Sequence, residues 1–134
     1  MVKIAWDPIY KAPLPEKHRF PMVKYELIPE QLIHHGIIDS HQLFSPKVMS
    51  RETILGVHDE DYLDQLEHLT LDPKSARRLG LPLTNTMVER EKIIIQGTLD
   101  NAHYAIEHGV SFNVAGGTHH SYKDRGEGFC LLND

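Results

Sequence analysis

The sequence has little or none of several features, and each shortage argues against a class of protein. It contains a single cysteine in 134 residues, so no disulfide can form within the chain. No apolar run approaches the roughly 20 residues that a spanning helix needs, and Met1–Tyr10 lacks the charged start and apolar middle of a signal peptide. Fourteen Lys and Arg against 19 Asp and Glu give a formal net charge of −5, which disfavours binding to nucleic acid. We therefore expect a soluble protein of the cytosol, bound neither to membrane nor to nucleic acid.

The length and composition are typical of one globular domain. A chain of 134 residues with 40% apolar residues can bury a core without metal or disulfide cross-links. We see no internal repeat, low-complexity tract or linker. Residues 1–134 are therefore interpreted as one compact unit.

The order of the periodic segments predicts an open, parallel α/β sheet. Val2–Trp6 alternates as a short strand does. Apolar residues after Pro21 recur at helical spacing as far as Gly36, and Pro29 within them predicts two short helices or a kink.

Two more helices and a strand are predicted downstream. Asp59 is placed to cap a helix that runs through Leu69. Thr86 and Glu89 have the spacing of a capping box, which predicts the start of a long helix that ends at Gly109. The buried face of this helix is predicted from residues that recur every three or four positions: Val88, Ile95, Leu99, Ala102 and Ile106. The short apolar run 110–115 then predicts a buried strand, so the order strand, helices, long helix, strand favours a parallel sheet.

The loop after this strand is where we expect chemistry, because ligands of such sheets bind beyond the carboxyl ends of the strands. Gly116–Gly117 permits a sharp turn and a close approach of the backbone to a ligand. His119 and His120 follow, and imidazoles exchange protons near neutral pH. Adjacent histidines also arise by chance in a chain that has ten of them, so a solvated loop pair is the alternative interpretation.

These motifs resemble those of a known family. Gly-Gly-Thr-His-His-Ser at 116–121, then Gly-Phe-Cys at 128–130 and Asn-Asp at 133–134, resembles the zinc-dependent histone deacetylases, above all the class IV type and its bacterial relatives. The resemblance extends upstream through 18–22, 58–63 and 79–82. It implies that residues 1–134 are the N-terminal portion of a single catalytic domain, truncated at its C-terminus, with the three-layer α/β/α, arginase-like deacetylase fold.

The resemblance also implies a role for each matching residue. His119 matches the histidine that is bonded to a buried carboxylate and assists electrostatically or as a proton donor, and His120 matches the general base toward zinc-bound water. Gly128 matches the glycine whose carbonyl receives the acetyl-lysine N–H. Phe129 matches one wall of the acyl-lysine tunnel, and Arg19 the arginine beside the internal channel that releases acetate.

The same resemblance implies zinc as the cofactor, with every ligand after residue 134. The missing ligands are two aspartates and one histidine, and the tyrosine that clamps the intermediate is missing with them. Asp39-Ser40-His41 has the form of a ligand pair but precedes the histidine loop, so we interpret it as a chance match. We expect an amidohydrolase that removes acyl groups from lysine side chains of a protein or peptide, and expect this chain to be inactive alone.

Two alternatives stay open at this stage. One keeps the enzyme and changes the substrate to a small acylated amine of the acetylpolyamine type. The other is a non-catalytic half-domain that docks onto a partner chain or self-associates through the apolar face left by the truncation. His34-His35 are expected at a helix end, where they offset the helix dipole, and His58 precedes the acidic first turn of a capped helix.

Overall fold

Three short strands form a parallel sheet in the order β2-β1-β3. The computed structural model describes all of residues 1–134, and its strands are β1 (Lys3–Ala5), β2 (Leu43–Phe44) and β3 (Ser111–Asn113). In the central strand, Ile4 pairs with Leu43 on one side and with Phe112 on the other. The predicted parallel α/β architecture is therefore confirmed, and the carboxyl ends of the strands lie at one edge of the sheet.

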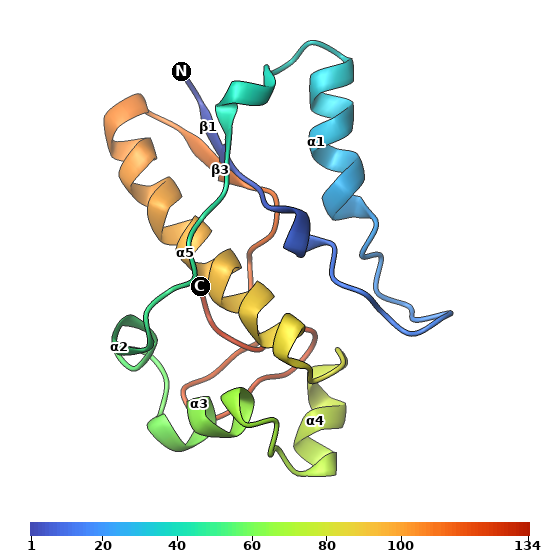
Figure 1. Ribbon diagram of the computed structural model, residues 1–134. Helices are drawn as coiled ribbons and strands as arrows, with labels where there is room; N and C mark the ends of the chain where they lie inside the picture. Colours follow the sequence, from blue (N-terminus) through green and yellow to red (C-terminus); the bar gives the residue numbers. More distant parts are fainter.

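Five α-helices and two short 3-10 helices complete the chain. The α-helices are α1 (Lys24–His34), α2 (Arg51–Ile54), α3 (Glu60–Glu67), α4 (Pro73–Leu79) and α5 (Asn85–His108), and the 3-10 helices are η1 (Pro8–Tyr10) and η2 (Ser40–Gln42). Figure 1 shows α5 crossing the molecule from β1 and β3 at one end to α3 and α4 at the other. No helix combines the length and the apolar content that crossing a membrane would require.

The long helix begins two residues before the predicted capping box. Thr84 is the N-cap, and its side chain accepts a hydrogen bond of 3.1 Å from the backbone N–H of Met87. An N-cap needs extended backbone, which Thr84 has (φ −132°, ψ 160°), whereas Thr86 already lies inside the helix. The predicted end is confirmed, since Gly109 follows the last helical residue with φ 88°.

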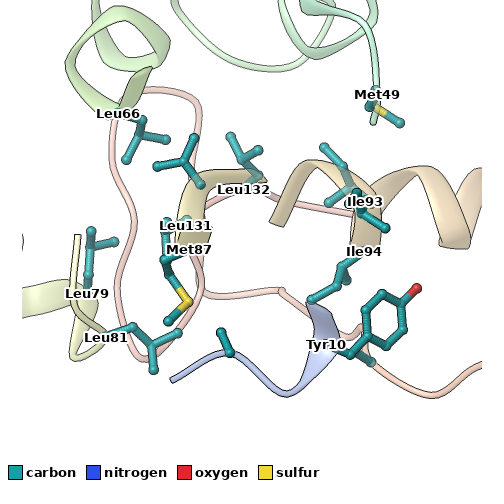
Figure 2. Close-up of a cluster of buried hydrophobic side chains, with 14 of the residues drawn as sticks. Tyr10, Met49, Leu66, Leu79, Leu81, Met87, Ile93, Ile94, Leu131 and Leu132 are labelled. Carbon is teal, nitrogen blue, oxygen red and sulfur yellow. The ribbon is translucent and has the colours of Figure 1, made fainter. Parts of the chain in front are cut away.

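The buried face of α5 matches the prediction only in its first half. Val88 and Ile95 are buried, but Leu99 is 39% exposed and Ile106 is 85% exposed. The core lies against the N-terminal half of the helix, where Met87, Ile93 and Ile94 pack (Figure 2). The run 110–115 is likewise not a buried strand, because β3 is at the edge of the sheet and Phe112 is 56% exposed.

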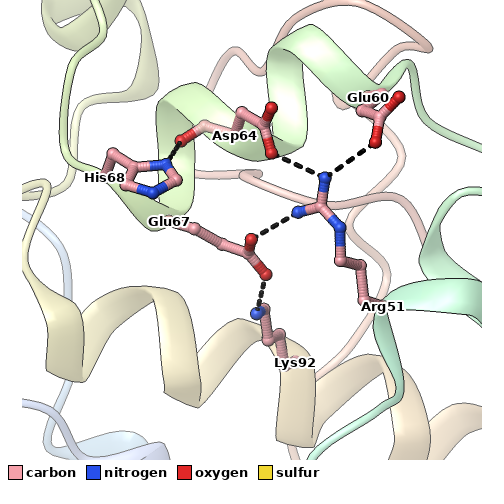
Figure 3. Close-up of polar contacts among 6 residues, drawn as sticks. All are labelled: Arg51, Glu60, Asp64, Glu67, His68 and Lys92. Carbon is pink, nitrogen blue, oxygen red and sulfur yellow. Dashed lines mark hydrogen bonds and ion pairs between the residues drawn. The ribbon is translucent and has the colours of Figure 1, made fainter.

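An ion-pair network fixes α3 against its neighbours (Figure 3). Nη2 of Arg51, at the start of α2, donates to Asp64 Oδ1 at 2.6 Å and to Glu60 Oε1 at 3.3 Å. Glu67 accepts from both Arg51 and Lys92 of α5. Burial raises the pKa of Glu67, but these two cations hold that pKa below its usual range. The network therefore joins α2, α3 and α5.

α1 runs unbroken through Pro29, where the sequence predicts two helices or a kink. Proline cannot donate to the carbonyl four residues earlier, which here belongs to Tyr25. The indole N–H of Trp6 fills the gap, with Nε1 2.6 Å from the Tyr25 carbonyl oxygen. A side chain from the segment after β1 thus replaces the hydrogen bond that the helix lacks.

Replacing Trp6 with Phe tests this replacement. The change leaves the carbonyl of buried Tyr25 without a donor, so we expect the free energy of unfolding to fall by about 1–3 kcal/mol, measured by urea denaturation. In a Pro29→Ala background the helix supplies its own N–H, and the same Trp6→Phe change should cost less. Equal costs in the two backgrounds would show that the indole bond does not compensate for Pro29.

Candidate functional site

The turn after β3 depends on two glycines. Gly116 and Gly117 have φ values of 152° and 71°, which side-chain-bearing residues rarely adopt. A Cβ atom at Gly116 would also lie only 3.1 Å from Asp134 Oδ2. This backbone reverses the chain directly after the sheet and presents the next two histidines on one side.

His119 and His120 come together as a pair. Their ring centroids are 4.0 Å apart with an interplanar angle of 47°. His119 Nδ1 lies 2.8 Å from the carbonyl oxygen of Gly117. A carbonyl only accepts, so Nδ1 carries a proton. The partner of His119 is therefore a backbone carbonyl within this chain, where the family resemblance implies a carboxylate.

Both rings line a cavity of about 180 Å³ that also includes Gly128 and Phe129. Gly128 has φ 53°, and a Cβ atom there would lie 3.3 Å from the His120 ring. The structure therefore brings together four of the five residues that the sequence singles out. Phe20, the start of α1 and the first half of α5 also contribute to the lining.

Phe129 is held in a strained backbone conformation beside the histidines. Its φ is 70°, and its N–H donates to the Leu79 carbonyl oxygen at 2.7 Å. A Cβ atom on Gly80 would lie 2.9 Å from Phe129 Cε1, so only glycine allows this contact. The Phe20 ring packs at a centroid distance of 4.9 Å and completes an aromatic wall.

Arg19 is the one predicted site residue that does not line the cavity. It is exposed, and its guanidinium carbon lies 5.3 Å from the centroid of the Phe129 ring. The cations that do line the cavity are Lys24 and Arg90. Arg19 belongs to the loop before α1, whereas Lys24 starts that helix and Arg90 lies on the buried face of α5.

Arg90 and Glu91 form a buried ion pair in the wall of the cavity, which sequence reasoning missed. Their exposed fractions are 2% and 1%, and Arg90 Nη1 donates to Glu91 Oε1 at 2.5 Å. Arg90 Nε also donates to the Tyr10 carbonyl oxygen at 2.7 Å. Glu91 Oε2 is buried without a partner. Burial raises the pKa of Glu91 to about 7, against the opposing effect of Arg90. The available signal was a run of four charged residues, Glu89 to Lys92, placed between the apolar residues Val88 and Ile93 of α5.

His58 ties the end of the chain to the start of α3. It is 3% exposed, and its Nε2 accepts the backbone N–H of Asn133 at 3.0 Å. Its Nδ1 lies 3.3 Å from the Lys123 carbonyl oxygen, so the ring is neutral with the proton on Nδ1. Asp59 occupies the predicted N-cap position, but its side chain pairs with Lys123 and makes no cap hydrogen bond.

The two other histidine motifs, His34-His35 and Asp39-Ser40-His41, lie at helix termini or in a short helix. His34 and His35 end α1, as predicted. Asp39 caps η2, and its N–H donates to Gln42 Oε1 at 2.9 Å. Across residues 1–134, no group of three or more His, Cys, Asp or Glu side chains is arranged to hold a metal ion.

The buried His58 makes stability depend on pH. Burial lowers its pKa in the folded chain, whereas the unfolded chain takes up the proton near the usual value of about 6.5. Unfolding therefore binds a proton between the two pKa values, and stability falls as the pH drops through that window.

We expect the His58→Gln variant to lose less stability than the parent when the pH is lowered from about 7.5 to 5.5, measured by urea denaturation. Gln keeps an acceptor for the Asn133 N–H and does not titrate. The matched control is His103→Gln, at an exposed position on α5, which should retain the parental pH dependence. If His58→Gln also retains it, protonation of His58 is not the cause.

Comparison with known proteins finds consistent relatives. Residues 18–134 match the family model described as the histone deacetylase domain. An uncharacterized protein of Picosynechococcus sp. is 41% identical over 131 residues, which is 98% of this chain and 44% of that protein. The acetoin utilization protein AcuC of Staphylococcus xylosus is 29% identical over 128 residues, or 88% of this chain and 33% of that protein.

Solved structures agree with these matches. The crystal structure of an HDAC homolog from Aquifex aeolicus has a TM-score of 0.78 at 27% identity, over 98% of this chain and 38% of that one. A crystal structure of an HDAC homolog complexed with SAHA has a TM-score of 0.79 at 28% identity, with the same coverage. The chain thus spans less than half the length of these relatives.

Proposed function

The chain belongs to the histone deacetylase family, and on this premise we propose that it forms the proton-transfer and acyl-binding side of a zinc-dependent deacetylase. One observation carries the proposal. His119 and His120 stand 4.0 Å apart and share one cavity with Gly128 and Phe129. Hydrolysis of an acylated amine needs groups that take and return a proton. The aromatic wall suits the alkyl chain of such an amine.

The two imidazoles are assigned different parts of the reaction. The His120 side chain makes no hydrogen bond within the chain, so it is free to take the proton of the attacking water. The water oxygen then bonds to the acyl carbon, the carbon–nitrogen bond breaks, and a protonated imidazole returns a proton to the leaving amine. His119 is held through Nδ1 by Gly117, which leaves Nε2 for this exchange.

The residues described here do not form a zinc site. Zinc needs about three protein ligands, and no such cluster exists in residues 1–134. We propose that the ligands lie beyond residue 134, in chain that corresponds to the additional length of the relatives. The proposal for this chain therefore rests on its histidines and its acyl-binding wall.

The proposed substrate is an acylated lysine side chain of a protein or peptide. Phe20 and Phe129 form an apolar wall with ring centroids 4.9 Å apart, which suits a lysine alkyl chain. A small acylated amine also has such an alkyl chain, so it is the alternative substrate. Assays of both classes with one enzyme preparation would discriminate between them.

A chimera provides the direct test of function. Residues 1–134 would replace the matching part of the Aquifex aeolicus homolog, whose remaining chain would complete the domain. We expect the chimera to deacetylate an acetyl-lysine peptide, and expect His120→Ala to lower kcat by about 10²–10⁴-fold, the usual contribution of a general base. His103→Ala, on the exposed side of α5, is the matched control and should leave kcat unchanged. A folded, zinc-loaded chimera without activity would refute the proposal.

The 134-residue chain alone should bind no stoichiometric zinc and show no deacetylase activity, because its described residues offer no ligand cluster. Equilibrium dialysis against zinc, followed by metal analysis, measures the first expectation, and a peptide deacetylation assay measures the second. One tightly bound zinc per chain, or zinc-dependent turnover by the pure chain, would contradict this account.

A further inference from the structure

The Lys and Arg residues that lack a carboxylate partner are concentrated in two segments. Six of the 14 cations form ion pairs with carboxylates, and the other eight form none. Six of these eight lie in residues 15–24 or 72–80, which are the loop into α1 and the helix α4: Lys17, Arg19, Lys24, Lys74, Arg77 and Arg78. The two segments contain only two carboxylates, Glu16 and Asp72. Positive charge is therefore gathered there in a chain whose net charge is −5.

The two segments lie together beside the aromatic wall of the cavity. His18 Nε2, in the first segment, lies 2.8 Å from the carbonyl oxygen of Gly80, which ends the second. The aromatic wall contains a ring from the first segment, and the Gly128 N–H donates to the Arg78 carbonyl oxygen in the second at 3.0 Å. The six cations thus belong to backbone that borders the cavity, and we call them the cationic rim.

Two cations of the rim stand over the aromatic wall itself. Lys24 Nζ lies 5.2 Å from the centroid of the Phe20 ring and 5.1 Å from that of Tyr25, and Lys24 lines the cavity. The guanidinium carbon of Arg19 lies 5.3 Å from the centroid of the Phe129 ring. An aromatic face attracts a cation but carries no net charge. Both cations therefore remain available to an anion that reaches this wall.

The cations of α4 are not explained by the helix alone. Lys74, Arg77 and Arg78 are exposed, and residues three or four apart share a helix face, where like charges destabilise the helix. Arg77 and Arg78 in the last turn favourably offset the helix dipole. Lys74 lies in the first turn, where a cation opposes that dipole. An anionic partner would relieve this repulsion.

We propose that the cationic rim binds acidic residues that flank the acylated lysine, so that the substrate is an acidic segment of a protein or peptide. This inference rests on the proposed function and adds the charge of the sequence around the lysine. A patch of one sign raises the local concentration of ligands of the opposite sign, and salt weakens the effect. The rim borders a cavity of about 180 Å³ that contains both histidines and the aromatic wall, which favours a peptide side chain over nucleic acid.

The test is binding of three fluorescently labelled acetyl-lysine peptides to the 134-residue chain, measured by fluorescence anisotropy. The peptides have the same length and carry Glu, Gln or Lys at the positions that flank the acetyl-lysine. We expect the Glu peptide to bind about 4- to 25-fold more tightly than the Gln peptide, because each of two exposed ion pairs contributes about 2- to 5-fold. The Lys peptide should bind most weakly. Raising the salt from about 50 mM to about 500 mM should reduce these differences.

Two double variants with equal net charge assign the preference to the rim. Arg77→Gln with Arg78→Gln removes two rim cations and should reduce the preference for the Glu peptide by about 2-fold or more. The matched control is Lys3→Gln with Lys47→Gln, which removes the two cations that lack a carboxylate partner outside the rim. It should keep the parental preference. A general effect of net charge would lower the preference equally in both.

If the Arg77 and Arg78 variant does not fold, Lys74→Gln makes the same test, because it removes a cation that opposes the helix dipole and should not destabilise α4. A smaller loss of preference is then expected, and an unchanged preference overturns the proposal. A Glu peptide that does not bind, or binds no better than the Lys peptide, also overturns it. So does a short DNA duplex that binds the rim more tightly than the Glu peptide.

Kinetics of the chimera separate this inference from the proposed function. Equal kcat/KM for the three peptides in an active chimera would refute the cationic rim as a substrate surface and leave the deacetylase proposal intact. An inactive chimera, together with a 134-residue chain that still prefers the Glu peptide, would refute only the proposed function.

Discussion

Leu131 and Leu132 are completely buried, and the site depends on the strip of backbone that they anchor. The Leu131 carbonyl oxygen accepts the Tyr62 hydroxyl at 2.6 Å and the Ser121 hydroxyl at 2.9 Å. Burial of each leucine side chain contributes roughly 1.5–3 kcal/mol. Phe129 lies two residues before Leu131 and Asp134 two residues after Leu132, so both ends of the strip have little freedom.

This anchoring explains how an irregular segment forms a defined site. Residues 114–134 contain no helix and no extended strand, only isolated bridges such as the one between Ser121 and Gly126. Their geometry comes instead from contacts with the regular elements. Phe129 bonds to the Leu79 carbonyl at the end of α4, and Asp134 accepts from Thr98 of α5. The helices therefore act as a frame for the loop that carries the histidines.

Three of the six buried polar residues, Arg90, Glu91 and Thr118, line the same cavity. Arg90 and Glu91 are both buried in its wall, and one carboxylate oxygen of Glu91 has no partner. A buried ion pair is weak evidence for stability, because desolvation offsets most of the attraction. It lies in the cavity wall beside the histidines, and Arg90 also contacts Tyr10 and Tyr25 of the apolar core.

Local signals predicted β1, α1, α3, α5 and β3 but not β2, α2 or α4, and further errors arose where contacts distant in sequence decide. Alternation in residues 2–6 and the glycine after α5 were sufficient to predict β1 and the end of that helix. Helical periodicity could not predict which half of α5 is covered, so Ile106 was expected to be buried and is exposed. Pro29 predicted a break in α1, because no local feature announces that Trp6 supplies the missing hydrogen bond.

The candidate site divides in the same way. The sequence by itself determined the turn and its histidines, because consecutive glycines permit conformations that other residues avoid, and the motif that contains them is specific. Only the tertiary structure decided which cations face the cavity and what holds the turn. Lys24, Arg90 and Asp134 are separated from His119 by 95, 29 and 15 residues of sequence. Their proximity follows from packing of the core, which a pattern of neighbouring residues does not encode.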